Sequence, residues 1–129
     1  VRKLQPDTAI VTDVSFALTP DADPRKCGKL GKGAMIGISP ILSNDMTNKL
    51  LELAKANDIP YQYEVMGGST GTDADRVTVS LMGVPTALLS IPQRYMHTPI
   101  ETVDVRDVAT VGDLMAAYIR EYDEGRYYR

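Results

Sequence analysis

The feature that most constrains this sequence is the alternation of short apolar or β-branched runs with amphipathic helical stretches. Each run lies between turn-forming residues and has the composition of a buried strand. The runs occupy residues 8–14, 34–38, 61–65 and 85–91, and Pro92 is expected to end the last of them. Alternation of this kind predicts an α/β fold of three layers, with a mostly buried sheet in the middle and flanking helices.

Two helices are predicted among these strands. Ser43 is a suitable N-cap for the first, with Asp45 in the favourable first turn, and Asp107 is expected to cap the second. The apolar positions at helical spacing are Met46, Leu50, Leu53 and Ala54 in the first helix, and Val111, Leu114, Met115, Tyr118, Ile119 and Tyr122 in the second. Each helix is therefore expected to pack one apolar face on the sheet.

The segment 75–82 fits two kinds of secondary structure. Alternate residues from Val77 to Leu81 are apolar, as in a strand. The same segment also fits a helical stripe, which Thr72 or Asp73 would cap. The sequence leaves both possibilities open.

Length and composition limit the class of protein. The chain has 129 residues, a formal net charge of −3 and a single cysteine, Cys27. It is one domain at most, and it lacks the basic stripe typical of nucleic-acid-binding modules. A lone thiol suits a reducing compartment, and neither a signal-like start nor an apolar run of about 18 residues is present. We therefore expect a cytoplasmic protein without nucleic-acid or membrane partners, and the start at Val1 predicts a processed or truncated piece.

Two side chains are candidate ligands, each with an ordinary structural alternative. His97, the one histidine, follows the strand expected over 85–91, where open α/β sheets bind ligands. It is either a loop histidine with one hydrogen bond or a metal ligand or general base. Asp13 lies in the apolar run 8–14, where a carboxylate is costly to bury unless paired, protonated or bound to a metal. The alternative for Asp13 is a turn-forming or capping role at the end of a strand.

A Gly-rich turn and the thiol are less specific features. Gly71, Thr72, Asp73 and Ala74 resemble a turn that opens a helix, where free N–H groups can hold an anion. Turns of this composition are common, and the sequence has neither a Walker A motif nor a dinucleotide-binding fingerprint. Cys27 is interpreted as a spare surface thiol rather than a reactive one.

The number of available donors limits any metal site. A catalytic zinc takes three protein ligands, and a two-metal site takes more, often with a bridging carboxylate. This chain offers one histidine and a few suitable carboxylates. The residues alone therefore indicate part of a hydrolytic metal site, or none.

Three stretches together resemble the tetrahedral-aminopeptidase family of dinuclear metallopeptidases, which includes glutamyl aminopeptidases and proteins once labelled endoglucanases. They are residues 6–15, residues 59–74 with Gly-Thr-Asp-Ala, and residues 83–101 with Arg-Tyr-Met-His-Thr-Pro; residues 30–33 also fit the family's loop. The resemblance covers essentially the whole chain but only the C-terminal part of the family's catalytic domain. It implies that residues 1–129 form a single partial domain, without the upstream half and its dimerisation insert.

The resemblance also implies a site. Asp13 resembles the carboxylate ligand of one metal ion, and His97 the imidazole ligand of the other, the ions being zinc or cobalt. A His-x-Asp motif, a bridging Asp and a Glu-Glu pair that supplies the general base would all lie upstream of Val1, so no catalytic residue is expected in this chain. Gly71, Thr72 and Asp73 are expected to line the pocket for the first residue of the substrate or its amine. Ser15 stands where the family usually has Thr.

The implied function is hydrolysis of N-terminal residues from peptides by two metal ions that polarise the carbonyl and activate a water. The chain by itself is expected to be inactive, because one ligand on each of two metals cannot hold a dinuclear centre. The resemblance also implies assembly into a tetrahedral shell of twelve subunits, so a homo-oligomer is expected. Removal of sheet neighbours is also expected to expose strand edges, so that the isolated chain self-associates.

Two other functions compete with this one. In the first, the chain is a non-enzymatic α/β assembly or binding module, and Asp13 and His97 are only structural. The second is glycoside hydrolysis, which needs two carboxyl groups on either side of one bond. Asp73, Asp75 and Glu101 are available for it, but their spacing does not select a pair.

Overall fold

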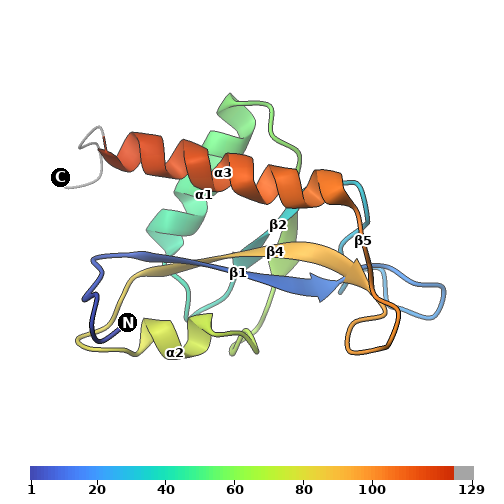
Figure 1. Cartoon of the computed structure of the whole chain (residues 1–129), viewed down its shortest axis with the longest axis horizontal. Coiled ribbons are helices and arrows are strands. Elements are labelled where there is room, and N and C mark those ends of the chain that lie inside the picture. Colours follow the sequence, from blue (N-terminus) through green and yellow to red (C-terminus); the bar gives the residue numbers. More distant parts are fainter. Residues whose placement is uncertain (124–129) are drawn as a thin grey trace.

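In the computed structural model, which describes residues 1–123, strands and helices alternate along the chain. The elements are β1 (Ala9–Phe16), β2 (Ala34–Ile38), α1 (Asn44–Ala56), β3 (Tyr61–Val65), α2 (Ala74–Thr78), β4 (Thr86–Arg94), β5 (Thr102–Val103) and α3 (Val105–Asp123). Figure 1 shows the sheet in the middle, with α1 and α3 on one side and α2 on the other. The predicted three-layer α/β fold is confirmed.

The sheet is mixed, and β4 is its central strand. The strand order is β1-β4-β2-β3. One edge of β4 pairs with β1 in parallel, while its other edge pairs with β2 and β5, both antiparallel. Strand β3 extends the sheet in parallel to β2. Strand β1 is therefore an outer strand, and within residues 1–123 its far edge has no strand partner.

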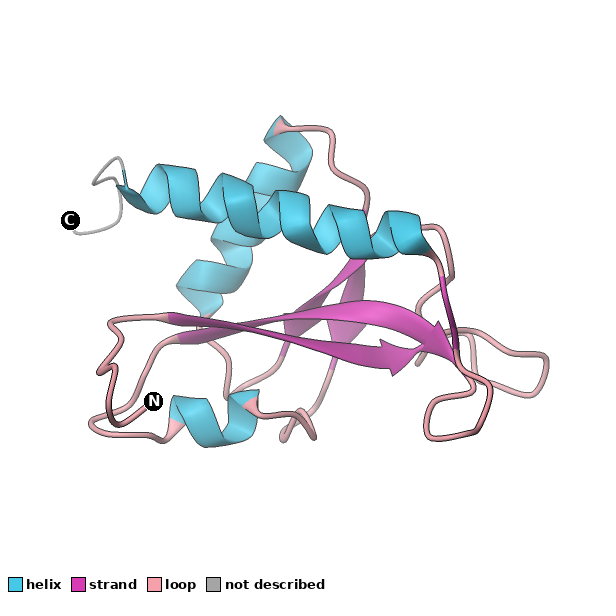
Figure 2. Ribbon diagram, viewed as in Figure 1, coloured by secondary structure: helices cyan, strands magenta, loops and turns pink. Residues whose placement is uncertain are grey.

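Most of the apolar core lies on one face of the sheet. Helices α1 and α3 cross this face (Figure 2), and both turn most of their predicted apolar positions toward it. Ile119 is the exception, because it was predicted to lie on the packed face of α3 and is 58% exposed. The buried core residues are Ala34, Ile36, Met46, Leu50, Leu53, Ala54, Ala87, Leu89, Val111, Leu114 and Tyr118. A smaller cluster of Leu42, Ala74 and Leu88 lies on the opposite face, under α2. Alternation along β4 thus separates a thick apolar layer from a thinner one that leaves room for polar groups.

The first helix begins as the sequence predicts. The side chain of Ser43 accepts a hydrogen bond from the backbone N–H of Met46, and Asp45 lies in the first turn. The ambiguous segment 75–82 is in part helical, since α2 covers Ala74–Thr78. None of the helices within residues 1–123 has the length and apolar composition needed to cross a membrane.

Strand β4 does not end at Pro92, so that prediction was wrong. The backbone carbonyls of Pro85 and Gln93 accept hydrogen bonds from the N–H groups of Ala9 and Ala17, on the β1 side. The backbone polar groups of odd-numbered residues in β4 therefore point toward β1, and the backbone of Pro92 points toward the opposite edge of the strand. Pairing with β2 extends only to Ser90 there, so the missing N–H of Pro92 breaks no bond to β2.

Helix α3 begins three residues earlier than predicted, and Asp107 does not cap it. Asp104 is the cap, because its side chain accepts a hydrogen bond from the backbone N–H of Arg106 at 2.9 Å. Asp107 instead is buried, with 1% of its surface exposed. Its two carboxylate oxygens accept hydrogen bonds from the backbone N–H groups of Gly31 and Gly33, each at 2.8 Å. This pairing of α3 with a loop distant in the sequence could not be predicted from helical periodicity.

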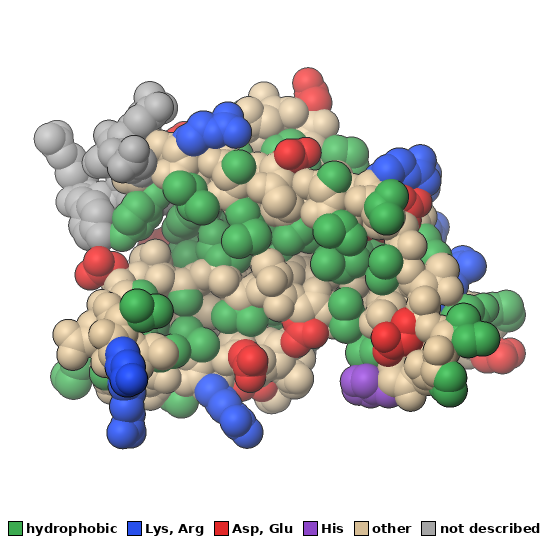
Figure 3. All heavy atoms as spheres, in the orientation of Figure 1, with side chains coloured by type: hydrophobic (Ala, Val, Ile, Leu, Met, Phe, Trp, Pro, Cys, Tyr) green, Lys and Arg blue, Asp and Glu red, His purple; other side chains and the backbone are tan. Residues whose placement is uncertain are grey.

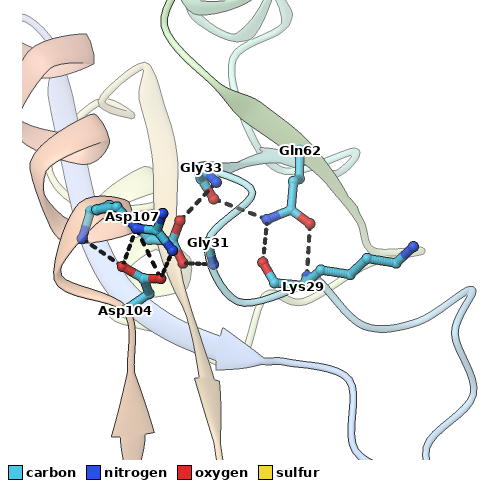
Figure 4. Close-up of polar contacts among 7 residues, drawn as sticks. Lys29, Gly31, Gly33, Gln62, Asp104 and Asp107 are labelled. Atoms are coloured by element: carbon cyan, nitrogen blue, oxygen red, sulfur yellow. Dashed lines mark hydrogen bonds and ion pairs between the residues drawn. The ribbon is translucent and has the colours of Figure 1, made fainter.

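The same loop is held from its other side by β3 (Figure 4). The side-chain amide of Gln62 donates to the carbonyls of Lys29 and Gly33 and accepts from the N–H of Lys29. Gly33 has a φ of +97°, and a Cβ there would collide with the backbone carbonyl of Pro60. The loop thus enters β2 in one fixed position, between Asp107 and Gln62.

Replacement of Asp107 by Ala is expected to lower the free energy of unfolding by about 3 kcal/mol. Two backbone donors lose their charged acceptor, and each unsatisfied buried group costs about 1–3 kcal/mol. Chemical denaturation of the purified chain measures the loss. Asp113→Ala is the matched control, because Asp113 lies exposed on the same helix; its effect is expected to stay within about 0.5 kcal/mol. Equal effects of the two substitutions would contradict the clamp.

Candidate functional site

Asp13 lies on the outer strand, on the face of the sheet that α2 covers. Its register partner in β4 is Ser90, which in turn lies beside Met35 of β2. The carboxylate is half-buried, and its Oδ1 accepts a hydrogen bond of 2.7 Å from the N–H of Val14. The backbone N–H groups of even-numbered residues in β1 point away from β4. The bond from Val14 to Asp13 therefore satisfies a backbone donor on the open edge of the sheet. The remaining oxygen of Asp13 has no cationic partner among the described residues.

The Gly-rich turn before α2 is shaped by one carboxylate. Asp75 accepts hydrogen bonds from the backbone N–H groups of Thr70 and Gly71 and from the hydroxyls of Ser69 and Thr70. These bonds favour the ionised form and lower the pKa of Asp75 to about 2, with the hydroxyl of Thr70 as the largest cause. The backbone N–H groups of Thr70 and Gly71 therefore have an internal acceptor, and an external anion is not required to satisfy them.

The turn and Asp13 line one open cavity. Its volume is about 420 Å³, and its lining residues are Asp13, Gly71, Thr72, Asp73, Asp75 and Arg76. The three turn residues predicted to contact the substrate thus lie next to the predicted metal ligand, although strand β1 and the turn are far apart in the sequence. Three carboxylates face one guanidinium in this cavity, so it favours a cationic group.

His97 lies in the loop between β4 and β5. This loop, orange in Figure 1, extends from the sheet on the side where α2 lies. The backbone N–H of His97 donates to Glu101 at 2.8 Å, and its φ is +63°, in a region that non-glycine residues rarely adopt. The side chain is exposed, and within residues 1–123 its imidazole makes no hydrogen bond. The structure does not place His97 among the residues that line the cavity of Asp13.

The donors present fit a fragment of a metal centre rather than a complete one. No group of three His, Cys, Asp or Glu side chains that could hold a metal ion occurs within residues 1–123. Asp13 offers a carboxylate oxygen into an open polar cavity, and His97 offers a solvent-facing imidazole. A carboxylate oxygen and an imidazole nitrogen are both types of ligand that a zinc ion takes.

A second cavity was missed by sequence reasoning. It lies against the ends of β1 and β3, and Glu64 is one of its lining residues. The Oε2 atom of Glu64 is buried and has no hydrogen-bond partner within residues 1–123. The alternation over 61–65 predicted the strand but not its neighbours, which depend on the pairing of Glu64 with Gly37. Cys27, predicted to be a surface thiol, is half-buried and lines this cavity.

Known proteins match this chain over most of its length. The family model of M42 glutamyl aminopeptidases matches residues 1–114. A lysyl aminopeptidase of Pyrococcus furiosus is 37% identical over 92% of the chain and 34% of its own length. The structure of an aminopeptidase from the archaeon Desulfurococcus kamchatkensis has a TM-score of 0.84 at 33% identity, over 92% of this chain and 35% of that one.

A third match concerns a protein of known assembly. The TET1 peptidase of Pyrococcus horikoshii can assemble into a tetrahedron or a large octahedral shell. It has a TM-score of 0.59 at 30% identity, over 85% of this chain and 32% of that one. The chain spans about a third of the length of the relatives it matches. Since the family model covers residues 1–114 of 129, the chain belongs to the M42 glutamyl aminopeptidase family.

Proposed function

We propose that this chain is the C-terminal part of the catalytic domain of a dinuclear metal-dependent aminopeptidase, which removes N-terminal residues from peptides. The observation that carries the proposal is the shared cavity of Asp13 and residues 71–73. A carboxylate expected to hold a metal and a turn expected to bind the substrate lie side by side there. Membership in an aminopeptidase family supports the same conclusion.

Asp13 would hold one metal ion through its carboxylate, and His97 would hold the other through its imidazole. When bound, two zinc or cobalt ions polarise the scissile carbonyl and activate a water. The backbone bond from Val14 to Asp13 Oδ1 fixes the orientation of that carboxylate. A general base is not assigned to this chain, and a Glu of the upstream part is proposed for that role.

The turn at residues 71–73 is proposed to bind the amine of the substrate. Asp73 is exposed and contributes a carboxylate to the cavity, as do Asp13 and Asp75. Together they attract the ammonium group at the N-terminus of a peptide. Since Asp75 fixes the backbone of the turn, Gly71 and Thr72 present their surface to the substrate in a defined position.

The open edge of β1 supports the proposal that this is a partial domain. Figure 3 shows hydrophobic side chains collected between α3 and β1 on the face where this edge lies. Phe16 of β1 and Val105, Val108 and Ile119 of α3 are among the exposed apolar residues. An apolar surface beside an unpaired strand edge is a suitable place for a further part of the domain to pack. We propose that the upstream half of the domain docks there, and that the complete enzyme is a cytoplasmic homo-oligomer, by analogy with the TET1 shells.

The competing functions make different use of the same residues. In a non-enzymatic assembly module, the bond of Asp13 to Val14 would be its whole role, and His97 would be an ordinary loop residue. Glycoside hydrolysis needs one carboxyl group that stays protonated near neutral pH. Asp75, with a pKa of about 2, is unsuited to that role. Metal content and substrate assays separate these functions.

The activity of the chain is the first test of the proposal. With zinc or cobalt added, the chain alone is expected to leave aminoacyl-4-nitroanilides intact, because it supplies one ligand per metal. In the full-length enzyme, Asp13→Ala and His97→Ala are each expected to lower metal content and reduce activity by at least about 100-fold. Asp45→Ala, which removes an exposed carboxylate of α1, serves as the control.

Two results would contradict this proposal in different ways. Robust turnover by the chain alone would show that it is not an incomplete centre. Unchanged metal content and activity in both full-length variants would remove the metal roles and favour the assembly module.

The second test concerns the turn and its dependence on pH. Because the pKa of Asp75 lies below the usual 3.8, its stabilising effect is full above about pH 4 and is lost as the pH falls toward 2. The denaturation midpoint of Asp75→Asn is therefore expected to lie below that of the unmodified chain at pH 7, with the difference shrinking below pH 4. Asp73→Asn, whose carboxylate accepts no bond from the turn, is expected to show no such convergence. A constant difference for Asp75→Asn would show that its carboxylate does not hold the turn.

The third test concerns the edge of β1. Sedimentation velocity is expected to show oligomers of the isolated chain. Thr12 faces its backbone N–H away from β4, so Thr12→Pro blocks the open edge without breaking the pairing with β4. This variant is expected to shift the distribution toward monomer, and Thr12→Ala, which keeps the N–H, is the matched control. A stable monomer of the unmodified chain would contradict edge-mediated association.

A further inference from the structure

We propose that Glu101 is a positioning residue for the metal centre, and that it holds the backbone of His97 so that the imidazole reaches the metal ion. The inference rests on the proposed metal-dependent aminopeptidase function and gives a role to a residue that has none in that proposal. It is drawn from the backbone conformation at His97, the hydrogen bonds of the loop and the attachment of Glu101 to the sheet.

The backbone of His97 has a conformation that needs a constraint from its surroundings. Its φ is +63°, and that of Tyr95, two residues before it, is +60°. Residues with a Cβ rarely adopt this left-handed region, because the Cβ comes too close to the following carbonyl oxygen. Such a conformation persists only where the surrounding structure enforces it, and conformations of this kind cluster at functional sites. The loop must therefore contain contacts that hold these residues in place.

Packing against the core does not supply this constraint. All residues from 97 to 101 are exposed. The backbone N–H of His97 makes a hydrogen bond, whereas its imidazole makes none within residues 1–123. The position of the imidazole therefore depends on the backbone that carries it, and on whatever fixes that backbone.

Glu101 supplies a contact that fixes the backbone at His97. Its Oε1 accepts a hydrogen bond from the N–H of His97 at 2.8 Å. A bond from a backbone N–H to a carboxylate is stronger than one between neutral groups. If His97 relaxes to a negative φ by turning the peptide before it, this bond breaks. The contact with Glu101 therefore opposes the relaxation of His97.

Thr98 holds the neighbouring part of the loop. Its N–H and its hydroxyl both donate to the carbonyl of Tyr95, at 3.2 and 2.6 Å, and the hydroxyl also lies 3.1 Å from the carbonyl of Ile100. These bonds close residues 95–100 into a turn. Thr98 thus holds the turn together, whereas Glu101 is the side chain that contacts His97 itself.

The position of Glu101 is fixed by strand pairing. Glu101 comes directly before β5, and the first residue of β5, Thr102, pairs with Arg94 at the end of β4. The loop therefore leaves the sheet at β4 and returns to the same strand through β5 (Figure 1). A ligand in a loop is held more precisely when its support lies on a rigid element. Glu101 thus ties the backbone of His97 to the central strand of the sheet.

The consequence for the metal centre concerns one of its two ions. In the proposed function, His97 gives its imidazole to one ion and Asp13 gives its carboxylate to the other. Loss of a group that orients a metal ligand typically lowers metal affinity by 10- to 100-fold. Loss of the Glu101 contact is therefore expected to weaken the binding of the ion that His97 holds, and to affect the ion of Asp13 much less.

The test measures zinc binding by the metal-free, full-length enzyme in competition with a chelator, so its readout is independent of activity. Two binding steps are expected, of which His97→Ala weakens mainly one and Asp13→Ala mainly the other. Glu101→Ala is expected to weaken the His97 step by about 10- to 100-fold. Glu101→Gln is expected to recover most of this affinity, because its amide oxygen accepts the same backbone N–H. Glu52→Ala, which removes an exposed carboxylate from α1, is the matched control.

Four results would overturn the inference. Unchanged zinc affinity in Glu101→Ala would do so and leave the aminopeptidase function intact. Equal losses in Glu101→Ala and Glu101→Gln would show that the carboxylate itself is needed, as a metal ligand is. Losses at both steps, with a lower unfolding temperature of the metal-free variant, would give Glu101 a general structural role. Unchanged zinc binding in His97→Ala would remove the metal role of His97 from the proposed function, and this inference with it.

Discussion

The rest of the structure depends on one constraint, which is that strand β4 is buried and paired on both edges. Because both edges of this strand are paired, its odd-numbered residues bond to β1 and its even-numbered residues face β2. The pairing with β1 places Asp13 at the outer edge of the sheet beside Ser90, and the end of β4 leads into the loop of His97. Both candidate ligands are therefore positioned by one strand that has no side chain of its own in the proposed chemistry.

Local signals in the sequence were sufficient for the elements that local interactions determine. Strands β2 and β3 and the Ser43 cap follow from periodicity and capping chemistry, so they were predicted with correct bounds. The failures involve residues whose partners lie far away. Pro92 is tolerated because β2 has ended beside it, and Asp107 is buried because a distant loop supplies two donors. Neither of these long-range contacts can be read directly from a single sequence.

The candidate site divides in the same way. Asp13 and the turn were singled out by motif, and the fold brings them to one cavity, while their roles stay predictions. Glu64 has no motif, since it is one polar residue in an alternating strand. The burial of its Oε2 atom depends on which residues surround it after β2 and β3 pair. His97 shows a further limit, because the groups that would complete its surroundings are proposed to lie outside this chain.

The clamp between Asp107 and the entry to β2 also has a consequence for the order of folding. The residues it joins are separated by 76 and 74 positions, so it closes only after most of the chain is available. Closing so long a loop is slow compared with forming the neighbouring β2, α1 and β3. A nascent chain that has left the ribosome only as far as β3 has Gln62 to hold this loop but not Asp107. Synthesis of the last helix therefore completes the attachment of a strand made much earlier.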